Sequence, residues 1–166
     1  MRKKLAVLAL VLFAATAAWA SPPYKSVGLG FSVGAAFPQH PAGDFQFDDW
    51  DTSFSWGFYV NIPVVWTFHI APSATLYQFH NINATDLDMA FKFIIPAWLL
   101  DLYLGVAPGV TTAGDEHMFN VGFLGGVAFN LFSNLDLFLE GRYKIIIEGN
   151  SNMRVLHAHA GVLWHF

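Results

Sequence analysis

The chain has 166 residues, of which only 12% are charged, whereas 55% are hydrophobic and 17% are aromatic. Five of its eight Lys and Arg residues remain after the first twenty residues, against twelve Asp and Glu, so the balance is acidic and argues against a nucleic-acid partner. The chain has no cysteine, which excludes disulfides and cysteine-based zinc sites, and no cofactor is predicted.

The first twenty residues have the order of features that marks a secretory signal peptide. Residues 2–4 are basic, residues 5–15 are apolar, and residues 18–20 read Ala-Trp-Ala before Ser21. The apolar run is too short for a transmembrane helix, and small residues flank the expected cleavage site. We therefore predict a cleaved signal peptide at 1–20 and one domain at 21–166.

The mature chain is unusually apolar, yet none of its segments is typical of a spanning helix. The most apolar stretch, 93–110, is interrupted by Pro96, Asp101 and Pro108. A membrane protein without spanning helices has to be a closed β-barrel, because only helices and barrels satisfy all backbone polar groups in lipid.

Hydrophobicity along the chain alternates with a period of two, which indicates β-strands with one apolar face. In 53–61, for example, Phe54, Trp56 and Phe58 alternate with Ser55 and Gly57. Strands are predicted at 25–36, 53–62, 66–79, 86–96, 102–112, 118–130, 135–147 and 153–166.

Three further features complete the predicted fold. Long and short links alternate, which is typical of extracellular loops and periplasmic turns and places both termini in the periplasm. Within 66–79, Pro72 and a drift of the apolar positions towards Tyr77 predict a β-bulge. The predicted fold is all-β, an eight-stranded antiparallel up-and-down transmembrane β-barrel.

The glycine-rich segment 27–37, the run 140–143 (Glu-Gly-Arg-Tyr) and the terminal Phe166 resemble the small outer-membrane barrels grouped around the OmpA-like and OmpX-like barrel domains. The resemblance covers the whole mature chain as a pattern. It implies location in the outer membrane of a Gram-negative bacterium, among membrane lipid and lipopolysaccharide. It also implies that Val162, Trp164 and Phe166 form an insertion signal that the outer-membrane assembly machinery recognises.

The polar positions of the later strands share the face that should line the lumen. The candidate lumen network comprises Asp88, Lys92, Glu140, Arg142, Lys144, His157 and His159. Pairing the last two strands places Glu140 near His159 and Arg142 near His157, with the small residues of the first strand leaving room for these larger groups. We interpret this set as a plug of hydrogen bonds and ion pairs. His157 and His159 could project together towards a metal, but no third ligand is evident, so no metal site is predicted.

The first long loop, 40–51, is the most distinctive segment predicted to be exposed. It combines carboxylates with aromatic residues, among them Asp44, Asp48, Asp49, Trp50 and Asp51. The carboxylates could bind divalent cations that bridge lipopolysaccharide phosphates, although the spacing is not that of an EF-hand. We favour a solvated acidic loop whose aromatic residues join the interfacial girdle.

These features favour a non-enzymatic outer-membrane protein with a structural or surface-interaction role through its loops. One alternative is a porin-like narrow pore for ions or small solutes. A second is a lipid-A-modifying enzyme that uses Glu148, Ser151 and His157. A third is a secreted soluble barrel of the lipocalin type. The sequence does not identify an external ligand.

Overall fold

The computed structural model describes residues 26–38, 52–79, 82–97, 100–148 and 151–166. The predicted signal peptide and the acidic loop at 40–51 lie outside these residues. Within these ranges no helix has the length and apolar character needed to cross a membrane.

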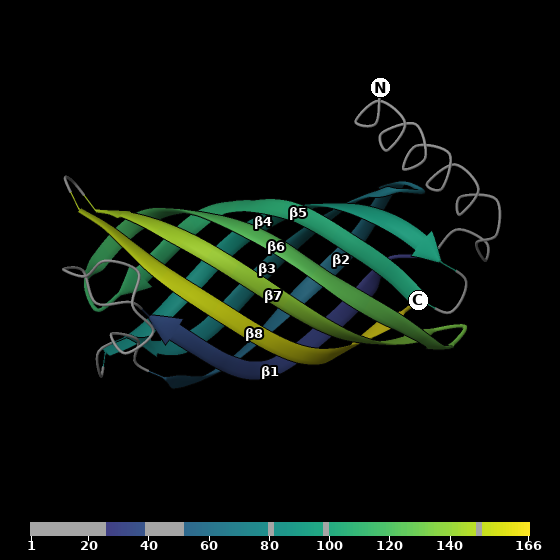
Figure 1. Ribbon diagram of the computed structural model, residues 1–166, viewed down its shortest axis with the longest axis horizontal. Coiled ribbons are helices and arrows are strands. Elements are labelled where there is room, and N and C mark those ends of the chain that lie inside the picture. The colour runs from purple at the N-terminus through teal and green to yellow at the C-terminus, as the bar shows by residue number, and fades with distance from the viewer. Residues whose placement is uncertain (1–25, 39–51, 80–81, 98–99, 149–150) are drawn as a thin grey trace, which may run out of the picture.

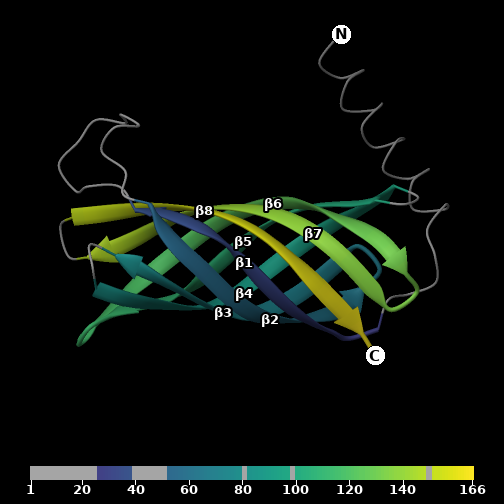
Figure 2. The same cartoon turned by 90° about the horizontal axis from the view of Figure 1, so that it is seen from below.

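The described chain forms eight β-strands that close into one barrel (Figure 1). Each strand pairs antiparallel with its sequence neighbours, and β8 pairs with β1. Seen from a second direction, the strands cross the barrel axis obliquely (Figure 2). Their bounds are β1 (Gly28–Pro38), β2 (Ser53–Val65), β3 (Phe68–Phe79), β4 (Ile82–Ala97), β5 (Leu100–Ala113), β6 (Glu116–Phe132), β7 (Leu135–Glu148) and β8 (Ser151–His165).

The predicted strands are confirmed, and their ends differ from the observed ones by at most four residues. The predicted bulge in the third strand is wrong. The register of β3 against β4 runs unbroken from Phe68 to Phe79, and Pro72 lies within it. Tyr77 points into the lumen and is 4% exposed, so the apparent drift came from a lumen aromatic residue rather than from an extra residue in the strand.

The register fixes how the strands tilt. Starting at Met153 on β8, paired residues can be followed once around the barrel and back to β8 at Leu163, ten residues further along. The residues on this path are Ile146, Asn120, Gly109, Asp88, Ser73, Tyr59 and Gly30. Because strand number and stagger together set the tilt, a stagger of ten in eight strands corresponds to a tilt of about 40°.

The two faces of the sheet differ as the alternation predicted. Outward positions carry large apolar side chains such as Phe58, Leu104 and Phe119, which are exposed, whereas the charged side chains of β4 and β7 turn inward. A continuous exposed apolar surface around the barrel would be unfavourable in water, but it matches the lipid-facing belt of a membrane barrel.

The narrow interior is filled by side chains that require small neighbours. Gly126 faces inward, where an added Cβ would lie 2.5 Å from the Tyr103 ring, and a Cβ on Gly30 would lie 2.1 Å from the Tyr59 ring. Gly30 therefore makes room for an aromatic residue of β2, whereas Gly34 lies beside His159, one of the larger lumen groups for which the sequence predicts such room.

Candidate functional site: the closed lumen

Six buried charged side chains from β4 and β7 form a continuous chain of ion pairs across the lumen. Lys92 Nζ lies 2.7 Å from Glu140 Oε2, and Glu140 Oε1 accepts a 2.9 Å hydrogen bond from Arg142. Arg142 also donates to Asp88 over 2.7 Å. The first half of the chain thus alternates in sign at each step.

The chain of ion pairs continues towards the loop end of the barrel, the end at which β7 is connected to β8. Lys144 lies there, and its Nζ lies 2.7 Å from Asp88 and 2.5 Å from Asp86. Three carboxylates and three cations therefore balance to a formal charge of zero. Buried charges are costly unless they are paired, and every member here has an opposite charge within 2.9 Å.

Neutral hydroxyl and amide groups extend the network beyond Asp86. Thr111 donates to Asp86 over 2.7 Å, and the Tyr77 hydroxyl donates to the same carboxylate over 3.3 Å. Asn120 in turn donates to Thr111 over 2.9 Å. Five of the eight strands, β3 to β7, therefore contribute side chains to one polar network.

The two predicted lumen histidines lie beside this network. The backbone pairs Glu140 with His159 and Arg142 with His157, the same pairing that the sequence predicts. However, Glu140 and Arg142 form ion pairs with each other and with Lys92 and Asp88 of β4, and His159 instead lies 2.8 Å from Ser55 Oγ. Adjacent strands fix the register, but the narrow lumen lets long side chains reach the far wall.

His157 is 2% exposed, and neither of its ring nitrogens has a hydrogen-bond partner within the described chain. Its Nε2 lies 3.7 Å from Asp86, whose oxygens already accept bonds from Lys144 and Thr111. Among the described residues, no group of three or more His, Asp or Glu side chains is placed to hold a metal ion.

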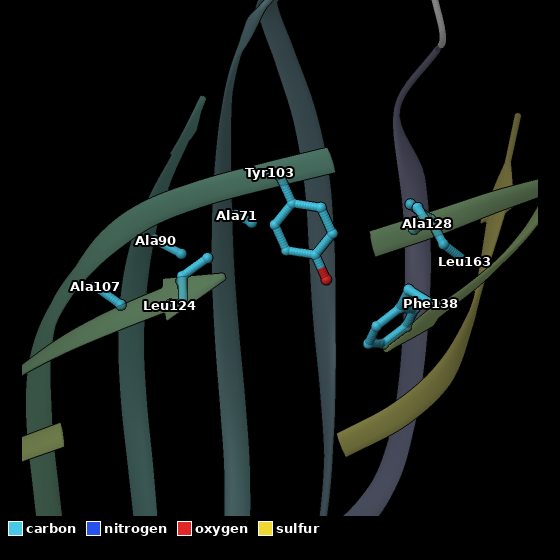
Figure 3. Close-up of a cluster of buried hydrophobic side chains, with 8 residues drawn as sticks. All are labelled: Ala71, Ala90, Tyr103, Ala107, Leu124, Ala128, Phe138 and Leu163. Carbon is cyan, nitrogen blue, oxygen red and sulfur yellow. The ribbon is translucent and has the colours of Figure 1, made fainter. Parts of the chain in front are cut away.

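Apolar layers lie in the lumen on both sides of the charged network. Towards the loop end, the buried cluster consists of Ala36, Tyr77, Ala84, Met118, Ile146, Met153 and Val155. On the periplasmic side, Tyr103 and Phe138 point into the interior among smaller side chains from several strands (Figure 3). Lys92 connects the charged network to this periplasmic apolar layer, because its Nζ lies 4.6 Å from the Tyr103 ring centroid.

Little free space remains between these layers. A cavity of about 10 Å³ adjoins Glu140, Arg142 and His159, and one of about 40 Å³ near the periplasmic end adjoins His69 and Asp136. The smaller volume is about the minimum for one water molecule. The charged network is therefore closely packed, with room beside it for about one water molecule.

Two of the three candidate enzymatic residues are backbone neighbours, and the third lies apart from them. Glu148 pairs with Ser151 at the loop end of β7 and β8, but His157 lies six residues further along β8 and faces the lumen. At about 3.3 Å per residue, six residues span about 20 Å, far beyond the hydrogen-bond reach that a base needs to activate a serine.

The remaining predicted site residues fall into two groups. Val162, Trp164 and Phe166 all face outward, and the Phe166 amide donates to the Val27 carbonyl over 3.0 Å. Asp44, Asp48, Asp49, Trp50 and Asp51 lie outside the described residues.

Sequence reasoning missed Asp86, the carboxylate on which Lys144, Thr111 and Tyr77 converge. Asp86 is two residues from Asp88 and therefore shares its lumen face. Three cations were expected in the lumen against two carboxylates, and this imbalance could have indicated Asp86 as the third carboxylate. Thr111 and Asn120 carried no such signal, since an uncharged side chain does not enter a balance of charges.

Solved structures give the fold an independent comparison. The crystal structure of Neisserial surface protein A matches with a TM-score of 0.74 at 18% identity, covering 84% of this chain and 97% of that one. The barrel has the fold of the small outer-membrane proteins. Two further matches are the attachment invasion locus protein Ail of Yersinia pestis (TM-score 0.51, 13% identity, 84% and 99% covered) and the outer membrane enzyme PagL (TM-score 0.53, 11% identity, 82% and 98% covered).

No protein-family model matches the chain, and neither does any curated protein sequence. The small outer-membrane barrel fold is thus shared with proteins of different kinds, including one described as an enzyme. Since one fold hosts unrelated functions, function has to be argued from this chain's own residues.

Proposed function

We propose that this protein is a non-enzymatic outer-membrane barrel with a closed lumen, which contributes to envelope structure and acts outward through its loops. The observation that supports the proposal is the balanced chain of six buried charges between two apolar layers. A conducting pore needs a hydrated path, whereas here the cavity beside Arg142 has room for about one water molecule.

The same arrangement argues against the enzymatic alternative. A lipid-modifying enzyme has to present its base and nucleophile to lipid at the wall or rim, but His157 and His159 point into the lumen. A barrel sealed in this way presents only its lipid-facing wall and its loops to other molecules.

The test is single-channel conductance of the refolded mature chain in a planar bilayer, after protease protection has confirmed insertion. A silent membrane is expected. The control is the double variant Lys92→Ser with Glu140→Ser, which removes one balanced pair and empties the centre of the lumen. Discrete conductance steps from the unmodified chain, altered in this control, would make the protein a pore and overturn the proposal.

A further inference from the structure

The outward face of the eight strands is almost free of charge. At the described outward positions, Arg154 on β8 is the one residue with a full charge at neutral pH, and it is half-buried. Outward amide, hydroxyl and imidazole side chains gather at the same loop end of the strands. They are Gln78, Asn83, Thr85, Thr112, His117 and Asn152.

The stagger of the barrel places these side chains at a common height. Paired residues followed once around the barrel move ten residues towards the periplasmic end, and therefore about five residues over half the circumference. When this five-residue shift is taken into account, Arg154 lies at the same height along the barrel axis as Asn83 and Thr85 on the opposite wall. The loop end of the wall thus carries a polar ring, with Arg154 as its one cation.

Below Arg154, β8 is continuously apolar on its outer face from Leu156 to Phe166. Ten residues at about 3.3 Å each, tilted by about 40°, span about 25 Å along the barrel axis, which is the height of the lipid-facing band of membrane barrels. Arg154 therefore lies directly at the outer edge of the hydrocarbon layer, where lipid headgroups begin.

The charge of Arg154 is not neutralised within the described chain. The three other described Lys and Arg residues, Lys92, Arg142 and Lys144, face inward and are paired with carboxylates. The strand neighbour of Arg154 is Ile145, which offers no acceptor side chain. A guanidinium at the edge of the hydrocarbon layer can extend into the headgroup region, where lipid phosphates offer anionic partners.

We propose that Arg154 binds a phosphate on the sugar headgroup of a phosphorylated glycolipid in the outer leaflet. The planar guanidinium presents paired donors that match phosphate oxygens. Asn152, two residues nearer the loop end on the same face, supplies amide groups for sugar hydroxyls. The lipid belt, the single cation and the polar ring together fit a ligand whose acyl chains lie below its charged sugar.

The proposal can be tested with the mature protein in nanodiscs of phosphatidylcholine, titrated with diphosphoryl lipid A and monitored by native mass spectrometry. Arg154→Gln should weaken binding about tenfold, since loss of a charge-assisted hydrogen bond typically costs one such factor or more. Arg154→Lys should retain most of the affinity. Leu104→Ala, on the outward apolar face of β5 and outside the polar ring, is the matched control and should leave binding unchanged.

Equal affinity of Arg154→Gln and the unmodified protein would overturn the proposal. An equal loss with phosphatidylglycerol as the titrant would overturn the choice of a glycolipid and leave a general phosphate contact. If dephosphorylated lipid A bound as tightly as the diphosphoryl form, phosphate would not be the group recognised. None of these results depends on whether the lumen conducts, so this proposal and the proposed function fail independently.

Discussion

At the scale of single residues, the most consequential contacts are those of the lumen charges. Lys144 is completely buried and contacts both Asp86 and Asp88, so it holds two carboxylates that would otherwise repel each other. A buried pair of charges adds little to the stability of the fold compared with an apolar pair of similar size. Removing one partner is destabilising, however, because it leaves an uncompensated charge.

Lys144→Met should therefore lower the free energy of unfolding by about 3–5 kcal/mol, because it leaves a net negative charge in the lumen. Urea unfolding of the refolded barrel in lipid vesicles measures this. The double variant Lys144→Met with Asp86→Asn restores the charge balance and should recover part of the loss. A double variant as unstable as the single one would show that charge balance is not what stabilises the lumen.

At the scale of the strand, the alternation of side chains assigns each residue to lipid or lumen. Leu139 on β7 faces outward and is 53% exposed, and its partner on β8 is Ala160, close to the middle of the apolar band. Gln78 on β3 also faces outward but lies in the polar ring at the loop end. The two positions share a face and differ in depth.

Leu139→Arg should cost about 2–4 kcal/mol of unfolding free energy, because it places a cation near the bilayer midplane. Gln78→Arg is the depth control and should cost about 0–1 kcal/mol. Both values can be measured by urea unfolding in vesicles of one lipid composition. Equal effects of the two substitutions would contradict the assigned position of the membrane.

At the scale of the whole molecule, closure depends on the contact between the first and last strands. β8 pairs with β1 over eleven residue pairs from Gly28 to Pro38, and Phe166 extends this seam through its bond to Val27. The last strand therefore completes the barrel, and it is also the strand for which the sequence predicts an insertion signal.

Deleting Phe166 should lower the amount of protein in the outer membrane of expressing cells while leaving refolding in vitro largely intact. Quantitative immunoblotting of membrane fractions measures the first effect. Phe132→Ala is the matched control, since Phe132 is also strongly exposed at the periplasmic end, but it is not terminal. If both variants lowered the level equally, the effect would come from lost lipid contact rather than from a terminal signal.

The strand number, the two faces and the register of the last hairpin could all be predicted from the amino-acid sequence. Each follows from local alternation, since a period of two assigns every side chain to one face. Tyr77 was the exception, because a large lumen aromatic residue resembles a lipid-facing one in sequence.

Which lumen charges meet could not be predicted from the sequence and became clear from the closed barrel. Lys92 and Glu140 are 48 residues apart, and no local pattern connects them. They pair because closure with a stagger of ten brings β4 and β7, three strands apart, to facing sides of a lumen narrow enough for their side chains to meet. The same stagger sets the height of Arg154 relative to the other walls, because height around a tilted barrel depends on all eight strands together.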